Sequence, residues 1–138
     1  MSAELSLQLS ATLDDIARLY DELEAFAAEQ SWTSKLEFEV KLVVEELFTN
    51  VVNYGGCPGE TVQIDFVSEP GRLTIEMADS GRPFDPLVDT PDPDTASPVE
   101  DRAIGGLGVH LVLTMMDEAS YRRDGNLNRL TLVKRREE

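Results

Sequence analysis

The chain has 138 residues, of which 41% are hydrophobic, and its formal net charge is −15 at pH 7. This length suits a single domain with one core, residues 1–138. The acidic balance argues against nucleic acid, whose phosphates need a basic surface, and against anionic membranes. The apolar runs are too short to cross a bilayer, and no basic stretch precedes a hydrophobic run at the N-terminus. A single cysteine, Cys57, suits a reducing compartment, so we expect a cytoplasmic protein.

The first half of the chain predicts one strand followed by two helices. Residues 4–9 alternate between polar and apolar, which is typical of a half-buried strand. Apolar residues then recur at helical spacing as far as Ala27, and a second, longer helix is expected to end near the Gly55-Gly56 breaker. Capping-box patterns mark both helix starts; they are Thr12 with Asp15, and Ser34 with Glu37.

The second half predicts a hairpin, a long loop, a helix and a second hairpin. Residues 61–67 and 72–78 alternate, and Ser-Glu-Pro-Gly joins them as a turn. Residues 86–101 are rich in proline and acidic side chains, as a mobile loop would be. A helix is expected from about Gly106 to Asp117. Two last strands around an Asp-Gly-Asn turn are expected at about 119–123 and 127–134.

These elements predict an α+β sandwich of two layers. The sheet is expected to be mixed and mostly antiparallel, with the helices covering one of its faces. The sequence shows no repeat and no internal domain boundary.

A polar line runs beside the apolar face of the second helix. At about 100° per residue, Glu46, Asn50 and Asn53 fall together on one flank of the core-facing arc. Glu45 points away from the core, so we expect it to lie in solvent. Glu46 is expected to be half-buried beside apolar neighbours, and such burial should raise the pKa of its carboxylate. Two interpretations fit: the line is the polar rim of the core, or Glu46 is a general base and Asn50 an oxygen ligand for Mg²⁺.

Asp79 ends an apolar strand and precedes Ser80-Gly81. An aspartate in this position commonly forms a turn. Alternatively, its carboxylate accepts a hydrogen bond from an exocyclic amine such as that of adenine, and Gly81 allows the ring to approach the backbone closely.

Glycines lead the predicted helix that follows the long loop. Gly105-Gly-Leu-Gly108 would turn backbone N–H groups toward an anion, helped by the helix dipole. The pattern is neither a Walker motif nor a dinucleotide fingerprint. His110, the only histidine, lies among apolar residues and is expected to pack in the core rather than to bind a metal.

Together these segments resemble the GHKL nucleotide-binding superfamily of DNA gyrase, heat-shock chaperone ATPases and sensor histidine kinases. They are most similar to the anti-sigma-factor serine kinases of the RsbW and SpoIIAB type. The resemblance covers nearly the whole chain and implies the Bergerat ATP-binding fold. Four segments carry it: Glu46–Gly55 resembles the N-box, Asp79–Pro86 the G1 box, Gly105–Glu118 the G2 box, and Asn128–Lys134 the last strand.

The resemblance implies ATP and Mg²⁺ as cofactors and transfer of the γ-phosphoryl group to a serine. Glu46 would be the catalytic base and Asn50 the Mg²⁺ ligand, and Asp79 would contact the adenine amino group. Residues 87–104 would form a lid, in which Arg102 stands two residues before Ile104, the position of the lid arginine in some relatives. The nucleotide-binding residues that the resemblance implies are Asn50, Asn53, Asp79, Gly81, Phe84, Arg102, Gly105, Gly106, Leu107, Gly108, Val109 and Thr131.

The resemblance also implies partners. Proteins of this type phosphorylate a STAS-domain anti-anti-sigma protein, many bind a sigma factor, and they are usually homodimers. The altered lid arginine leaves open an alternative, a catalytically weak nucleotide-dependent binding module. The catalytic domain of a sensor histidine kinase fits less well, because residues 1–30 contain no phospho-accepting histidine.

Overall fold

The computed structural model describes residues 2–55, 59–85, 87 and 106–135, with the backbone alone for residues 106–109 and 111. Residues 88–104 of the predicted lid, which include Arg102, lie outside the described residues, and so do Gly105 and Cys57. The helices and strands have the bounds β1 Ala3–Ser10, the short 3-10 helix η1 Leu13–Asp15, α1 Ile16–Glu29, α2 Ser34–Tyr54, β2 Thr61–Glu69, β3 Arg72–Asp79, α3 Gly106–Met115, β4 Glu118–Asp124 and β5 Leu127–Arg135.

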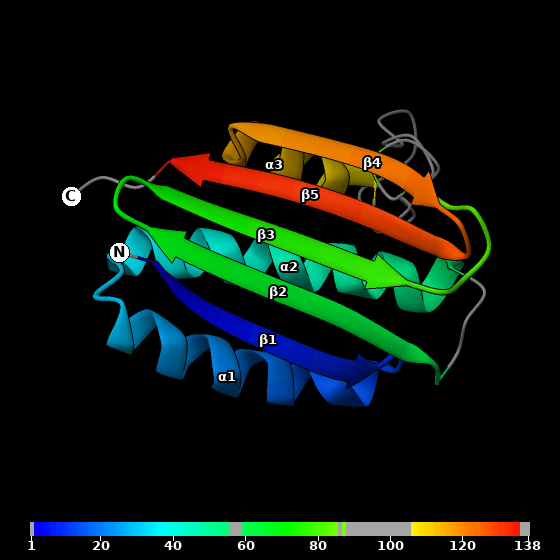
Figure 1. Ribbon diagram of the computed structural model, residues 1–138, viewed down its shortest axis with the longest axis horizontal. Coiled ribbons are helices and arrows are strands. Elements are labelled where there is room, and N and C mark those ends of the chain that lie inside the picture. The colour runs from blue at the N-terminus through cyan, green and yellow to red at the C-terminus, as the bar shows by residue number, and fades with distance from the viewer. Residues whose placement is uncertain (1, 56–58, 86, 88–105, 136–138) are drawn as a thin grey trace, which may run out of the picture.

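The strands form one five-stranded sheet in the order β1-β2-β3-β5-β4. Each neighbouring pair among the described strands is antiparallel, so this sheet is antiparallel throughout and not mixed as expected. Helices α1, α2 and α3 all lie against the same face of the sheet, with α1 beside β1 and α3 behind β4 and β5 (Figure 1). The predicted α+β sandwich of two layers is confirmed.

Two tight turns close the predicted hairpins. Glu69 pairs with Arg72, and Gly71 between them has φ 77°, as the third residue of a type II turn requires after proline. Asp124 pairs with Leu127, and Gly125 with φ 59° opens that two-residue turn, as a type II′ turn requires. Both hairpins were predicted from these turn residues.

The predicted helix caps were wrong in detail. The Thr12 side chain makes no capping bond, and Asp15 instead accepts a hydrogen bond from the Ser10 backbone N–H at 2.7 Å. The cap of α2 lies one residue earlier than predicted: Thr33 Oγ1 accepts from the Leu36 N–H at 3.1 Å. Thr33 and Ser34 are adjacent and both carry a hydroxyl that can accept from the first N–H groups of the helix, so the sequence alone determines this start only to within a residue.

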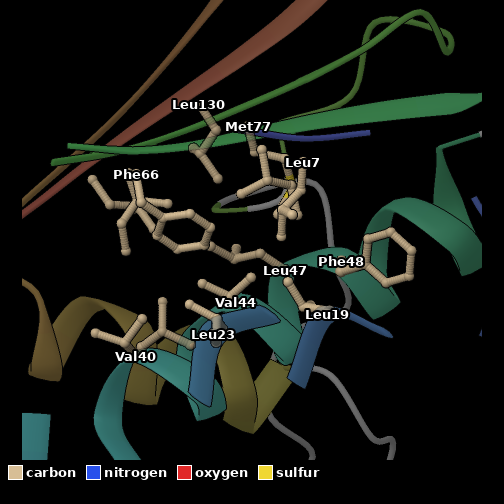
Figure 2. Packing of buried hydrophobic residues seen from close by; sticks show 14 of the residues in the cluster. Leu7, Leu19, Leu23, Val40, Val44, Leu47, Phe48, Phe66, Met77 and Leu130 are labelled. Carbon is tan, nitrogen blue, oxygen red and sulfur yellow. The ribbon is translucent and has the colours of Figure 1, made fainter. Parts of the chain in front are cut away.

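The core lies between the helices and the covered face of the sheet. Figure 2 shows side chains of α1 and α2 facing those of the strands. Each large apolar side chain buried in this layer stabilises the fold by roughly 1.5–3 kcal/mol. No helix within the described ranges is both long and apolar enough to cross a membrane. The labelled members of the core are Leu7, Leu19, Leu23, Val40, Val44, Leu47, Phe48, Phe66, Met77 and Leu130.

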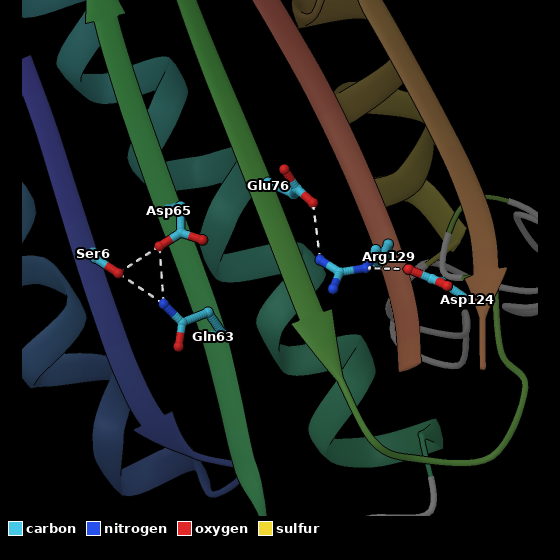
Figure 3. Close-up of polar contacts among 6 residues, drawn as sticks. All are labelled: Ser6, Gln63, Asp65, Glu76, Asp124 and Arg129. Carbon is cyan, nitrogen blue, oxygen red and sulfur yellow. Dashed lines mark hydrogen bonds and ion pairs between the residues drawn. The ribbon is translucent and has the colours of Figure 1, made fainter. Parts of the chain in front are cut away.

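The opposite face of the sheet is polar. Figure 3 shows two groups of contacts on it, one between β1 and β2 and one across β3, β5 and β4. In the second group Arg129 bonds both Glu76, at 3.1 Å, and Asp124, at 3.0 Å. Because strand side chains alternate between faces, this group identifies which residues of β5 point away from the helices.

Candidate functional site

The polar line on α2 faces α3. Glu39 lies two turns before Glu46 on the same side of the helix, and its carboxylate pairs with Lys134 of β5 at 3.8 Å. Lys134 also donates to the carbonyl of Met115, the last residue of α3, at 2.6 Å. The side of α2 that carries Glu39, Glu46 and Asn50 is therefore turned toward α3.

Glu46 and Asn50 each have a buried polar atom without a hydrogen-bond partner among the described residues. Asn50 is only 1% exposed, and neither its Nδ2 nor Glu46 Oε1 makes a hydrogen bond within the described residues. Burial raises the pKa of Glu46, the neighbouring Asn50 side chain offsets part of that rise, and the charge of Glu45 adds to it. A buried polar group without a partner costs roughly 1–3 kcal/mol, so this pair is a candidate binding feature.

Glu45 was expected in solvent, and this expectation was wrong. Its carboxylate is half-buried and accepts a short hydrogen bond from the Tyr20 hydroxyl of α1. Helix α1 covers this side of α2, which periodicity within one helix cannot reveal. The two adjacent glutamates therefore differ, because Glu45 is bonded to a neighbouring helix and Glu46 keeps one oxygen that has no bond within the described part of the chain.

Asp79 ends β3 with its side chain on the covered face of the sheet, and it is 4% exposed. Its Oδ1 accepts from the Gly81 N–H at 2.9 Å and from Asn128 Nδ2 at 3.0 Å. The first bond is the local turn that an aspartate two residues before an N–H forms. The Asp79 carboxylate can therefore form the local turn and also serve as an acceptor for a ligand.

Arg82 joins the Asp79 turn to the end of α2. Its backbone N–H donates to Gly55 O at 3.0 Å, and its guanidinium donates twice to Tyr54 O, at 3.0 and 2.6 Å. These bonds satisfy carbonyls that a helix end leaves without partners. The helix turn that follows Asn50 is thereby held beside the Asp79 turn, and the ring of Phe84 lies 6.2 Å from that of Tyr54.

Asn128 of β5 is a residue of this site that the sequence analysis missed. It is 3% exposed and lies opposite Asp79 in the register of β3 and β5. A signal was present, because Asn128 occupies the inward phase of a strand whose next inward residues are Leu130 and Leu132. A polar residue among the inward-facing apolar residues of a strand indicates either the edge of the core or a buried hydrogen bond.

The resemblance implied that Thr131 binds the nucleotide, but in the strand register it is Asn128, and not Thr131, that lies opposite Asp79. Thr131 pairs with Glu76 and Ser120, three residues along β5 from Asn128. An odd separation turns the side chain to the other face, where Arg129 also lies (Figure 3). A shift of one or three residues in a strand reverses the face of a side chain, so a motif alone does not determine the face on which Thr131 lies.

Helix α3 begins toward the same end of the sheet as Asp79. Its last residue is bonded to Lys134, which pairs with Leu73 at the start of β3, whereas Asp79 ends that strand. Ten helical residues extend about 15 Å, so the helix runs back from that bond toward the Asp79 end, behind β4 and β5 (Figure 1). The predicted helix from Gly106 is confirmed, and its first backbone N–H groups have no partners inside the helix.

Three further side chains were placed by the structure. Asn53 is exposed, one turn beyond Asn50, and Phe84 is buried at 2% exposure beneath the Arg82 guanidinium, 5.7 Å from its ring centre. His110 was expected in the core but is exposed on α3. The side chains of Leu107 and Val109 lie outside the described part of the chain.

Comparison with protein families gives a match over residues 9–134 to the family described as histidine kinase-like ATPase domain. Serine/threonine-protein kinase BtrW of Bordetella bronchiseptica is 30% identical over 130 residues, which cover 93% of this chain and 91% of the relative. Serine-protein kinase RsbW of Bacillus pumilus is 31% identical over 130 residues, covering 89% of this chain and 72% of the relative. The predicted resemblance is confirmed at the level of the family.

Solved structures show the same fold. The RsbU and RsbW domains of Rv1364c from Mycobacterium tuberculosis match with a TM-score of 0.65 and 14% identity, over 97% of this chain and 32% of that one. The histidine kinase AdeS of Acinetobacter baumannii matches with a TM-score of 0.54 and 14% identity, over 97% of this chain and 68% of the other. At this identity the likeness concerns the fold.

Proposed function

Because the chain belongs to the family of histidine kinase-like ATPase domains, we propose that it is an ATP-dependent protein-serine kinase. The observation that carries this proposal is the pair Glu46 and Asn50, whose buried polar atoms lack partners among the described residues on the side of α2 that faces α3. The curated relatives at about 30% identity are serine-protein kinases, which supports the same activity for this chain.

Glu46 is the proposed general base. Burial raises the pKa of Glu46, which brings a carboxylate closer to the strength that proton abstraction near neutral pH requires. In the reaction the serine oxygen bonds to the γ-phosphorus while the bond from that phosphorus to the β–γ bridging oxygen breaks. The serine proton passes to Glu46, and ADP leaves with the electron pair. Catalysis of this kind is mainly positioning and charge stabilisation.

The remaining residues have proposed roles in holding ATP. Asp79 accepts a hydrogen bond from the adenine amino group, with Gly81 and Phe84 beside the ring. Backbone N–H groups of Gly105 and of residues 106–109 at the start of α3 bind the phosphates, and Arg102 contributes from the lid.

Asn50 is the proposed link to the metal. Its Nδ2 lacks an acceptor among the described residues, which a phosphate oxygen would supply, and its Oδ1 is an oxygen ligand of the kind Mg²⁺ takes. No cluster of three or more His, Cys, Asp or Glu side chains able to hold a metal occurs in the described ranges, which fits an ion bound chiefly through the nucleotide. When bound, Mg²⁺ neutralises phosphate charge.

We further propose the partners that the family resemblance implies. The substrate is a small STAS-domain anti-anti-sigma protein, and the kinase acts as an anti-sigma factor in a partner-switching system. A homodimer in the cytoplasm is the proposed form. The acidic surface, with a net charge of −15, favours protein partners over nucleic acid.

A second candidate function is a nucleotide-dependent binding module without substantial kinase activity. It is favoured by one observation, that Ile104 directly precedes the glycines while Arg102 lies two residues earlier. Loss of a cation at the γ-phosphate would slow transfer and leave nucleotide binding largely intact.

One assay separates the two candidates. The chain is incubated with γ-labelled ATP, Mg²⁺ and the candidate STAS protein, and the label on serine is measured together with ATP affinity. Glu46→Gln should lower transfer by roughly 10²–10⁴-fold with ATP affinity nearly unchanged. Glu45→Gln is the matched control, since it removes the adjacent charge, and should stay within a few-fold of wild type. Equal transfer by Glu46→Gln and wild type would show that Glu46 is not the base, and no label with wild type would favour the binding module.

A further inference from the structure

The side chain of Asn128 has one possible orientation. Its Nδ2 donates to two acceptors, Asp79 Oδ1 at 3.0 Å and Arg82 O at 2.8 Å. Its Oδ1 accepts from donors that cannot be exchanged for acceptors, the Phe84 N–H at 3.1 Å and Arg123 Nη1 at 3.2 Å. A flipped carboxamide would oppose like groups on both sides, so the surrounding bonds fix which atom is nitrogen.

Strand β4 supplies two of the donors to this oxygen. The Tyr121 hydroxyl donates to Asn128 Oδ1 at 2.5 Å, and Arg123 donates both to that oxygen and to Gly81 O, at 2.8 Å. Tyr121 is half-buried and pairs with Leu130 in the strand register. The hairpin of β4 and β5 is therefore bonded to the turn after Asp79 at several points.

These bonds end on the Asp79 carboxylate. The last torsion of an aspartate side chain has a broad energy profile, so the plane of the carboxylate is set by its hydrogen bonds. Gly81 N–H and Asn128 Nδ2 both bind Oδ1, from opposite parts of the chain. If a group that donates to Asn128 Oδ1 is removed, Asn128 is held less firmly and fixes the plane of the Asp79 carboxylate less well.

We propose that Asn128 and Tyr121 are positioning residues that set the preference of this site for adenine over guanine. The proposal rests on the proposed function, in which Asp79 contacts the base. A fixed carboxylate accepts from the 6-amino group of adenine and repels the 6-oxo group of guanine, and such hydrogen-bond selection requires a rigid acceptor. Neither residue touches the reacting phosphate, so their effect falls on base choice and affinity.

The test compares two tyrosine variants in the full chain. Tyr121→Phe removes the hydroxyl that bonds Asn128, and Tyr20→Phe, the matched control, removes a hydroxyl that bonds Glu45 elsewhere. Affinities for ATP and GTP with Mg²⁺ are measured by calorimetry, together with the melting temperature. Tyr121→Phe should lower the ratio of ATP to GTP affinity by about fivefold, and Tyr20→Phe should leave the ratio unchanged although its melting temperature falls. Arg123→Lys provides a second change at the same oxygen and should lower the ratio too.

The outcomes are distinguishable. An unchanged ratio in both Tyr121→Phe and Arg123→Lys, with wild type preferring ATP, overturns the positioning role and leaves the proposed kinase standing. A wild-type chain that binds neither nucleotide overturns the proposed function and this inference with it. A lowered ratio in Tyr20→Phe equal to that in Tyr121→Phe also overturns the inference, because general destabilisation would then explain the effect.

Discussion

Two polar regions near the same end of the sheet differ in how completely their atoms are bonded. Around Asp79, a buried carboxylate and the carboxamide of Asn128 share one network with the turn that follows β3. On α2, Glu46 and Asn50 are also buried or half-buried, yet each keeps a polar atom without a partner among the described residues. The hydrogen bonds of the first region are formed within the chain, whereas the second region keeps polar atoms that could bond a ligand.

This difference in hydrogen bonding indicates which part of a ligand each region would contact. A bonded, rigid acceptor selects a planar base by shape and hydrogen-bond pattern. Unbonded donors and a carboxylate with a raised pKa suit phosphates, a cation and a proton that move during reaction. The unbonded polar atoms at the reactive end lower the stability of the fold, and the hydrogen-bonded network at the recognition end raises it.

The largest expected effect on nucleotide affinity tests the recognition end, the Asp79 network. Asp79→Asn keeps an oxygen for Gly81 N–H and Asn128 but removes the charge, and charged hydrogen bonds contribute about 1.5–3 kcal/mol. ATP affinity should fall at least about tenfold, as measured by calorimetry. Circular dichroism should show the same fold, and an unchanged affinity would remove Asp79 from the base contact.

A smaller effect is expected at the reactive end, where a substitution at Glu46 should raise the stability of the fold. Because burial raises the pKa of Glu46, the ionised carboxylate weakens the fold at neutral pH. The contribution of this group to stability is full below the carboxyl pKa of the unfolded chain and is lost as pH rises through the raised value. Glu46→Gln should therefore melt about 2–5 °C higher than wild type at pH 7.

The pH dependence supplies the control for that variant. Below about pH 4 the carboxyl is protonated in both the folded and the unfolded chain, so the difference in melting temperature between Glu46→Gln and wild type should shrink. A difference that stays constant from about pH 4 to pH 8 would rule out ionisation of Glu46 as the source of the stability change.

The smallest expected effect concerns the difference between Glu45 and Glu46, and it is measured through the hydrogen bond from Tyr20 to Glu45. Desolvation, followed by the hydrogen bond to Glu45, raises the pKa of Tyr20 to about 12. Tyr20→Phe should cost roughly 1 kcal/mol of unfolding free energy at pH 7. The difference from wild type should decrease from about pH 10 to pH 12, because the unfolded tyrosine ionises first. Urea unfolding across that range measures it, and a difference independent of pH would mean that the hydroxyl bond is unimportant.

The fold was predictable because local signals agreed along the chain. Alternation located β1, β2 and β3, and Pro70-Gly71 identified the turn between the last two of these. The turn at Gly125-Asn126 located β4 and β5 on either side of it. Helix starts were less well determined, since Thr33 and Ser34 are both good caps and only packing selects between them.

The site was predictable only in part. The position of Asp79 at a strand end and the flank of Glu46 followed from sequence periodicity. The bond from Tyr20 to Glu45 and the pairing of Asn128 with Asp79 depend on contacts between distant segments, which periodicity within one element does not contain. Thr131 shows the same limit, because only the register with β3 reveals its face.

The most direct test of the two-part site is ATP binding with and without Mg²⁺, measured by calorimetry on wild type, Asp79→Asn and Asn50→Ala. Mg²⁺ should strengthen ATP binding to wild type, and Asp79→Asn should weaken both affinities by the same factor. Asn50→Ala should remove most of the gain from Mg²⁺, and it should lower the affinity for ATP alone by a smaller factor, because only the proposed bond from Asn50 Nδ2 to a phosphate oxygen is lost. An Asn50→Ala chain that retains the full gain from Mg²⁺ would contradict the assignment of α2 to the phosphate end.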